Sequence, residues 1–128
     1  PGGRYQLEAA IQSAHVVRRV TGSADWRAIA ALYGSLAEMT ASPVVAINRA
    51  VAIAEVDGPA AGLDALGHIA GDPRLAEYQP YWAAFADLSA RAGNLADADA
   101  AYQRAIGLES DMAVRRFLQR KRAGLTFS

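Results

Sequence analysis

Short breaks between long helical stretches constrain the fold of this chain more than any other feature. Asp57-Gly58-Pro59 ends one helical stretch and begins the next within three residues, and Gly93-Asn94 makes a similar break later in the chain. Glycine is favoured just after a helix, and proline is favoured at the first position inside one. Connections this short oblige the two helices to lie side by side and antiparallel. The sequence therefore predicts a fold built from helix pairs.

The composition indicates the same class of fold. Alanine supplies 30 of the 128 residues, whereas valine, isoleucine and threonine together supply 17. Alanine is the best helix former, and β-branched residues favour strands. No segment alternates between apolar and polar residues over a useful length. We therefore predict an all-α protein.

Apolar periodicity and capping residues place seven helices in the sequence. The predicted spans are about 5–20, 26–40, 43–56, 59–70, 80–92, 95–108 and 111–123. Asp25 and Ser42 are predicted N-caps, and Ser110 or Asp111 is the predicted cap of the last helix. The segment 74–79 is predicted to be a loop with one turn.

A repeat of about 34 residues relates three of these helices, which begin at Trp26, Pro59 and Leu95. Similar residue types recur three, seven and ten positions after each start. These positions hold Ile29, Gly62 and Ala98, then Tyr33, Leu66 and Tyr102, then Leu36, Ile69 and Ala105. One helix pair cannot bury its own apolar face, so the units are expected to stack.

The segment Trp82–Ser110 resembles a tetratricopeptide (TPR) repeat. The matching positions are Trp82, Phe85, Ala86, Gly93, Ala98, Tyr102 and Ala105. Ser89 and Ser110 depart from the repeat, which commonly has Tyr and Pro there. The resemblance implies a right-handed stack of about three antiparallel helix pairs, 5–40, 43–71 and 80–108, with a capping helix over 111–123. It also implies that the aromatic residues Trp26, Tyr33, Trp82, Phe85 and Tyr102 pack helix against helix.

A second resemblance covers nearly the whole chain and depends on three ordered blocks. The blocks are Tyr5–Gln12 followed by His15; Asp25-Trp26 through Ile29 to Leu32-Tyr33; and Pro43–Val45, Asn48–Ala52 and Gly58–Leu63. Together they resemble the C-terminal extension of a group of bacterial extracytoplasmic-function (ECF) sigma factors, which carry sigma regions first and a TPR-like domain last. The resemblance implies that residues 1–128 are one such domain, and the absence of Met at Pro1 favours a fragment of a longer protein.

Charge and residue types argue against several classes of function. The 13 basic and 13 acidic residues give a net charge of zero, whereas free-standing nucleic-acid-binding domains are usually basic. Cysteine is absent, and His15 and His68 lack a third ligand at a recognisable metal-binding spacing. His15, beside the first helix's apolar face, is expected to be a core or boundary histidine. We expect no catalytic residues, no metal and no cofactor.

No apolar run approaches the roughly 18–20 residues that a membrane span needs. We therefore expect no membrane association and a cytoplasmic location.

Asn48 is the most informative polar residue, because Asn is a mediocre helix former inside a helix. The resemblance to the TPR repeat implies that Asn48 faces the concave groove and binds a partner. The alternative is a hydrogen bond from Asn48 to a neighbouring loop. The expected groove residues are Val44, Ile47, Asn48 and Val51.

Two further residue sets follow from the same register. Pro80 and Ala84 stand where carboxylate-binding TPR domains carry cations, which argues against that mode of binding. Arg49 is expected to point into the helix packing, where it would need a partner.

The last helix concentrates positive charge. Residues 1–110 carry a net charge of −4 and residues 111–128 a net charge of +4. Ala113, Val114, Phe117 and Leu118 form an apolar stripe, with the cations mostly beside it. One interpretation is a capping helix with a solvated outer face. The other is a basic contact for an acidic partner surface or DNA phosphate, made by Arg115, Arg116, Arg120 and Arg122.

These features predict a noncatalytic regulatory domain that binds proteins within an ECF sigma factor, whose parent protein acts in transcription initiation. The expected partner is its own sigma regions, core RNA polymerase or a regulator; DNA would be bound only through the missing sigma regions, and a homodimer is open. The alternative is a free-standing TPR adaptor or scaffold unrelated to transcription. A small enzyme is the weakest hypothesis.

Overall fold

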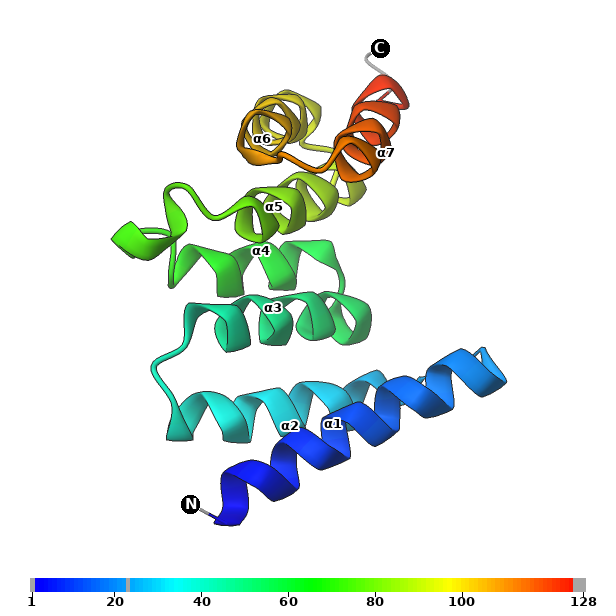
Figure 1. The fold of residues 1–128 in the computed structure, drawn as a ribbon, viewed down its shortest axis with the longest axis vertical. Coiled ribbons are helices and arrows are strands. Elements are labelled where there is room, and N and C mark those ends of the chain that lie inside the picture. Colours follow the sequence, from blue (N-terminus) through cyan, green and yellow to red (C-terminus); the bar gives the residue numbers. More distant parts are fainter. Residues whose placement is uncertain (1, 23, 126–128) are drawn as a thin grey trace.

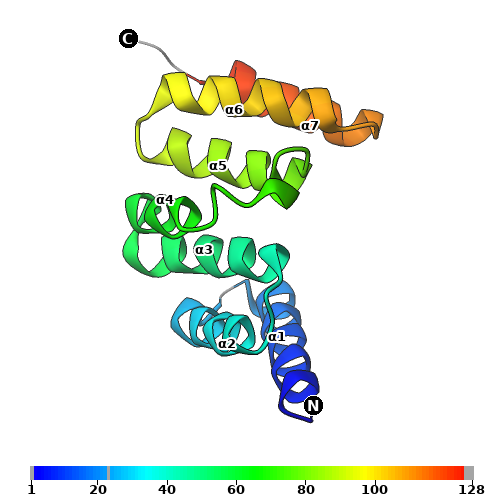
Figure 2. The same cartoon turned by 90° about the vertical axis from the view of Figure 1, so that its left-hand side faces the viewer.

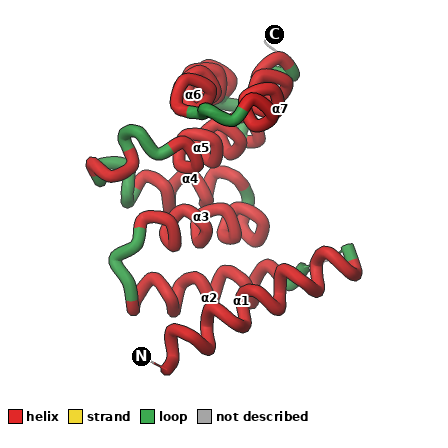
Figure 3. The backbone as a smooth tube through the Cα atoms, viewed as in Figure 1, coloured by secondary structure: helices red, strands yellow, loops and turns green. Residues whose placement is uncertain are grey.

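The computed structural model describes residues 2–22 and 24–125, with the backbone alone for Tyr5 and residues 16–21. The described chain is helical and contains no strand (Figure 3). Its elements are α1 (Gly2–Thr21), α2 (Trp26–Met39), α3 (Pro43–Asp57), α4 (Pro59–Gly67), the 3₁₀ turn η1 (Pro73–Leu75), α5 (Gln79–Arg91), α6 (Leu95–Leu108) and α7 (Met112–Ala123). The all-α class is confirmed. The block residue Tyr5 and the apolar residue Val17 have side chains outside the described part.

The predicted caps form as hydrogen bonds to the first turn of each helix. The Asp25 carboxylate accepts from the Ala28 N–H at 3.1 Å, and the Ser42 hydroxyl accepts from the Val45 N–H at 3.4 Å. At the last helix Asp111, rather than Ser110, accepts from the Ala113 N–H at 2.8 Å. Each cap satisfies an N–H that has no partner within its own helix.

Two glycines with positive φ close the short breaks. Gly58 has φ 98° between α3 and α4, and Gly93 has φ 86° between α5 and α6. Around Gly93, the Asn94 N–H donates to the Ser89 carbonyl at 2.8 Å and the Gly93 N–H donates to the Ala90 carbonyl at 3.1 Å. This pair of bonds is a Schellman motif, which ends a helix where glycine can adopt positive φ.

Helix α4 ends at Gly67, three residues before the predicted end near Ala70. The His68 N–H donates to the Ala65 carbonyl and the Ile69 N–H donates to the Leu66 carbonyl, at 3.3 and 3.1 Å. These i to i−3 bonds tighten the last turn and stop the α-helical ladder. The turn η1 then overlaps the start of the segment 74–79, which is predicted to be a loop with one turn.

The helices form a stack in which α3 occupies a central position. It packs against α2 and α4 and also contacts α5. Helix α6 contacts both α5 and α7. Helix α1 runs antiparallel to α2 and is tilted across it (Figure 1). Helix α2 is seen from the side in Figure 1 and nearly end-on in Figure 2. Helix α6, by contrast, is seen nearly end-on in Figure 1 and from the side in Figure 2. The axes of α2 and α6 therefore run in different directions.

Eight of the nine repeat positions lie on the buried face of α2, α4 or α6, and the ninth, Ile69, follows the end of α4. Three residues after each start, Ile29 and Ala98 are 1% and 0% exposed, and Gly62 is also buried. At the other two positions the buried residues are Leu66, Tyr102, Leu36 and Ala105, and the half-buried residues are Tyr33 and Ile69. The repeat register therefore identifies the core-facing side of each helix.

Aromatic residues of α5 join the two halves of the core. One buried cluster is centred on α3, α4 and α5, and the other on α5, α6 and α7. Trp82 and Phe85 are half-buried and pack against both clusters. Trp82 also donates from Nε1 to the Ala76 carbonyl at 3.1 Å, which fixes the loop before α5. As predicted, these aromatic side chains pack helix against helix.

Helices α3 and α4 are in close contact at Gly62. A Cβ atom at this position would lie 2.7 Å from the Ala54 Cβ, 2.9 Å from the Leu88 Cδ1 and 3.0 Å from the Ala50 carbonyl oxygen. Such distances are shorter than van der Waals contact, and two of the three atoms belong to the α3 backbone or to its short alanine side chain. Glycine is therefore required for this packing distance.

We predict that Gly62→Ala destabilises the protein by about 1–3 kcal/mol, because the added methyl group overpacks the contact between α3 and α4. Gly67→Ala is the matched control on the same helix, since a Cβ atom added at Gly67 would meet nothing within 4 Å. It should change the free energy of unfolding by no more than about 0.5 kcal/mol. Urea denaturation followed by circular dichroism measures both, and equal stability of the two variants would contradict the packing described here.

Candidate protein-interaction surfaces

A groove of about 480 Å³ lies between α1, α2 and α3. We call it the α1–α3 groove. Its lining residues are Glu8, Ala9, Ile11, Gln12, Tyr33, Leu36, Val45 and Asn48. The walls thus combine apolar side chains with one carboxylate, two amides and one phenol. A groove with this mixture can make both apolar contacts and hydrogen bonds to a bound molecule.

Asn48 is exposed on α3 and lies in the wall of this groove. In the described part of the chain its side-chain amide makes no hydrogen bond to a loop, which was the alternative interpretation. The amide can donate two hydrogen bonds and accept two. It is therefore available to a bound partner.

The other three predicted groove residues have different environments. Ile47 is 4% exposed and belongs to the core cluster of α3, α4 and α5, so its assignment to the groove is wrong. Val44 is 43% exposed, and Val51 is half-buried; neither lines the groove. The physical reason is that α3 is covered on more than one side, by α2, α4 and α5, which leaves only part of its circumference open.

Tyr33 and His15 form a half-buried polar contact at the groove. The His15 Nε2 and the Tyr33 hydroxyl are hydrogen-bonded at 3.3 Å, between α1 and α2. Burial raises the pKa of the Tyr33 hydroxyl, so it stays protonated at neutral pH. His15 is therefore a boundary histidine with a hydrogen-bond partner, as predicted, and it helps to fix the groove wall.

The sequence prediction missed the contribution of α1 to the groove. Glu8 and Gln12 lie one helical turn apart and line the groove together. Their spacing beside the apolar face of α1 is visible in the sequence. The TPR register assigned the groove to α3, however, and gave no role to the helix before it. Glu8 also pairs with Arg4 at 3.1 Å on the surface of α1.

Arg49 is exposed rather than inserted into the helix packing, which corrects the prediction for this residue. Its Nε lies 3.5 Å from the position that a Cβ of Gly34 would occupy, so the side chain extends across α2 where α2 has no side chain. Arg49 lines a second cavity, of about 440 Å³, between α2, α3 and α4. Asp64 and His68 line the same cavity.

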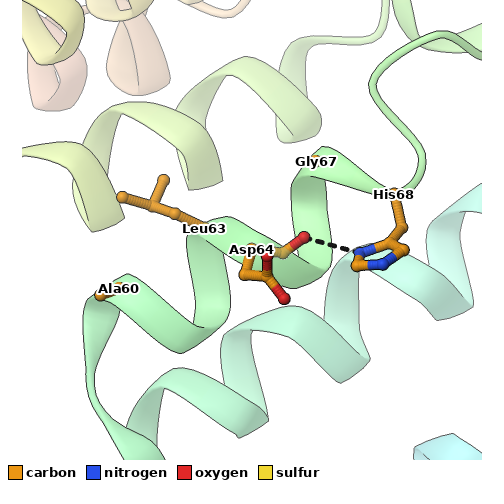
Figure 4. Close-up of a pocket in the computed structure, with 5 residues that line it drawn as sticks. All are labelled: Ala60, Leu63, Asp64, Gly67 and His68. Atoms are coloured by element: carbon orange, nitrogen blue, oxygen red, sulfur yellow. Dashed lines mark hydrogen bonds between the residues drawn. The ribbon is translucent and has the colours of Figure 1, made fainter.

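The outer side of α4 carries a shallow depression formed by one helix (Figure 4). Its only hydrogen bond between labelled residues joins the His68 Nδ1–H to the Asp64 carbonyl oxygen, at 2.8 Å. This bond spans a single helical turn and gathers no side chains from other elements. Within the described residues, no three His, Asp or Glu side chains are grouped so that they could hold a metal ion.

The four arginines predicted as a basic contact on α7 divide into two pairs. Arg122 donates from Nε to the Asp99 carboxylate at 2.7 Å, and Arg115 donates from Nη1 to the Glu109 carbonyl at 3.2 Å. These two cations are engaged within the chain. Arg116 and Arg120 are exposed and make no ion pair in the described part of the chain. Of the four arginines predicted to form a basic contact, Arg116 and Arg120 are therefore the two without an intramolecular partner in the described part of the chain.

The predicted apolar stripe of α7 also divides. Leu118 is 3% exposed and Val114 is half-buried, and both pack into the cluster of α5, α6 and α7. Phe117 is 52% exposed, and Ala113 is also exposed. A simple capping helix would have a purely polar outer side. The outer side of α7 is not purely polar, because Phe117 and Ala113 are exposed there.

Comparisons with known proteins give one match at the sequence level. The chain is 34% identical over 117 residues to an uncharacterized protein of Rhizobium meliloti (strain 1021). The match covers 91% of this chain, and the chain spans 27% of the length of that relative. Neither models of known protein families nor solved structures match the chain. In the described residues, no helix is both long and apolar enough to cross a membrane.

The ion pair between Arg122 and Asp99 predicts a pH dependence of stability. A hydrogen bond from Arg122, and to a smaller extent one from Gln103, holds the pKa of the Asp99 carboxyl below its ordinary value. A carboxyl whose pKa is lower in the folded state stabilises the fold above its unfolded pKa of about 3.9, and this stabilisation is lost as the pH falls through the folded pKa. We therefore predict that Asp99→Asn loses less stability than the wild type between neutral pH and about pH 3.

Asp64→Asn is the control, because the Asp64 carboxylate forms no ion pair in the described part of the chain. Thermal denaturation at a series of pH values measures the effect. If Asp99→Asn and the wild type lost stability in parallel, the pair between α6 and α7 would not contribute as described.

Proposed function

We propose that this chain is a noncatalytic protein-interaction domain that binds its partner in the α1–α3 groove. The observation that carries the proposal is that the residues that line the groove are largely the residues that resemble ECF sigma factor extensions. Seven of the eight groove-lining residues belong to the three sequence blocks of that resemblance, and only Leu36 lies outside them. The same segments therefore carry both the sequence resemblance and the candidate binding surface.

The chemistry of the groove supports binding of a peptide segment or a helix. Ala9, Ile11, Leu36 and Val45 offer apolar contact, while Gln12 and Asn48 offer amides that can pair with a main chain. Stacked helix pairs commonly bind partners in grooves of this kind. The polar groups are two amides, the Tyr33 phenol that is hydrogen-bonded to His15, and the Glu8 carboxylate that is paired with Arg4. This set suits recognition better than catalysis.

On this proposal the domain belongs to an ECF-type sigma factor that directs RNA polymerase to promoters in the cytoplasm. The domain itself would contact the sigma regions, core RNA polymerase or a regulator, and it would leave DNA recognition to the sigma regions. A right-handed TPR-like stack is part of the same proposal. The match to about a quarter of a longer relative supports a domain of this type working inside a larger chain.

The test is a pull-down with this chain as bait, offered separately produced sigma regions and core RNA polymerase. Asn48→Ala and Val45→Glu should each reduce capture about tenfold, because they remove a hydrogen-bonding amide and place a charge on an apolar wall. Asn94→Ala is the matched control: Asn94 is exposed at the start of α6 and its side chain makes no capping hydrogen bond.

Equal capture by the wild type and the groove variants would contradict the assignment of the groove. If the chain captured neither the sigma regions nor the polymerase, the link to transcription would be wrong, and a free-standing adaptor would be favoured. Circular dichroism of each variant separates loss of binding from loss of folding.

A further inference from the structure

Two rows of exposed side chains cover the outer side of α7. One row is Met112, Arg116 and Arg120, and the other is Ala113, Phe117 and Lys121. We call these six residues the α7 outer face. Each row is spaced by four residues, so its members lie above one another on the helix surface. The face lies at the opposite end of the stack from α1 and is therefore separate from the α1–α3 groove (Figure 1).

The cations of this face are free of acidic partners. No ion pair in the described part of the chain includes Arg116, Arg120 or Lys121. Asp87 lines a cavity together with Arg120 and Lys121, but its carboxylate is paired with Arg91 at 3.5 Å. The face contains no acidic residue of its own. It therefore offers three positive charges to another molecule.

Two large apolar side chains lie among these cations. Met112 is 59% exposed and Phe117 is 52% exposed. They are two of the four large hydrophobic residues that the described chain leaves exposed. The Lys121 ammonium lies 6.0 Å from the Phe117 ring centroid, which holds apolar and basic groups together on one surface.

This combination favours a protein partner over nucleic acid. Phosphate contacts would use the cations alone and leave Phe117 and Met112 in water. An amphipathic helix with acidic residues beside its apolar stripe would cover both kinds of group, since helix-in-groove partners bury apolar anchors at helical spacing. Complementary charge would then set the orientation and speed of association.

We propose that the α7 outer face binds an acidic amphipathic helix of a partner protein. Phe117 and Met112 contact the partner's apolar stripe, and Arg116, Arg120 and Lys121 pair with the carboxylates beside it. Arg115 and Arg122 take no part, because their guanidinium groups are held within the chain.

The experiment uses the whole chain and a synthetic amphipathic helix whose leucine stripe is flanked by glutamates. A second peptide has the same composition in an order that forms no stripe. Fluorescence anisotropy should show at least about tenfold tighter binding of the first peptide. Arg116→Glu and Phe117→Ser should each weaken its binding about tenfold. Arg27→Glu changes the net charge equally at an exposed site on α2 and should leave binding unchanged.

Several results would overturn the proposal. These are no binding of the striped peptide, equal binding of the two peptides, and equal weakening by Arg27→Glu and Arg116→Glu. Tighter binding of a DNA duplex or of phosphatidylserine vesicles than of the striped peptide would also overturn it, because the face would then recognise phosphate or lipid. All substituted residues are exposed, and circular dichroism checks that each variant is folded.

Discussion

The close approach of α3 and α4 at Gly62 is the contact on which the rest of the stack depends. Helix α3 is the element shared by the contacts to α2, α4 and α5, and its separation from α4 is set by Ala50, Ala54 and Gly62. Small residues allow backbones to approach until their atoms meet. A shift of α4 would also move Leu88, through which α5 reaches the same contact. One position without a side chain therefore governs how three helices lie together.

Much of this arrangement could be predicted because the deciding interactions are local. Asp25, Ser42 and Asp111 cap the helices that follow them, and Gly58 and Gly93 turn the chain with a positive φ. Capping and turn chemistry depend on neighbours in sequence, so residue types alone indicate them. The repeat positions Ile29, Gly62 and Ala98 likewise mark the buried side of their helices.

The side-chain environments that depend on distant elements could not be predicted in this way. Ile47 and Asn48 are adjacent on α3, yet one is in the core and the other lines the α1–α3 groove. Which sides of α3 are covered depends on where α2 and α5 lie, and the sequence of α3 does not contain that information. Arg122 similarly meets Asp99 only because α7 lies against α6. The burial of Ser89 is another such environment: its hydroxyl has no hydrogen-bond partner in the described chain.

Our two proposals place binding surfaces at opposite ends of the stack, with the α1–α3 groove as the principal site. Hydrogen–deuterium exchange of the chain, alone and mixed with separately produced sigma regions, tests this claim most directly. The account predicts slower exchange of backbone amides in α1 and α3 beside the groove when the sigma regions are present. Unchanged exchange in both helices, or protection confined to α5 and α6, would contradict it.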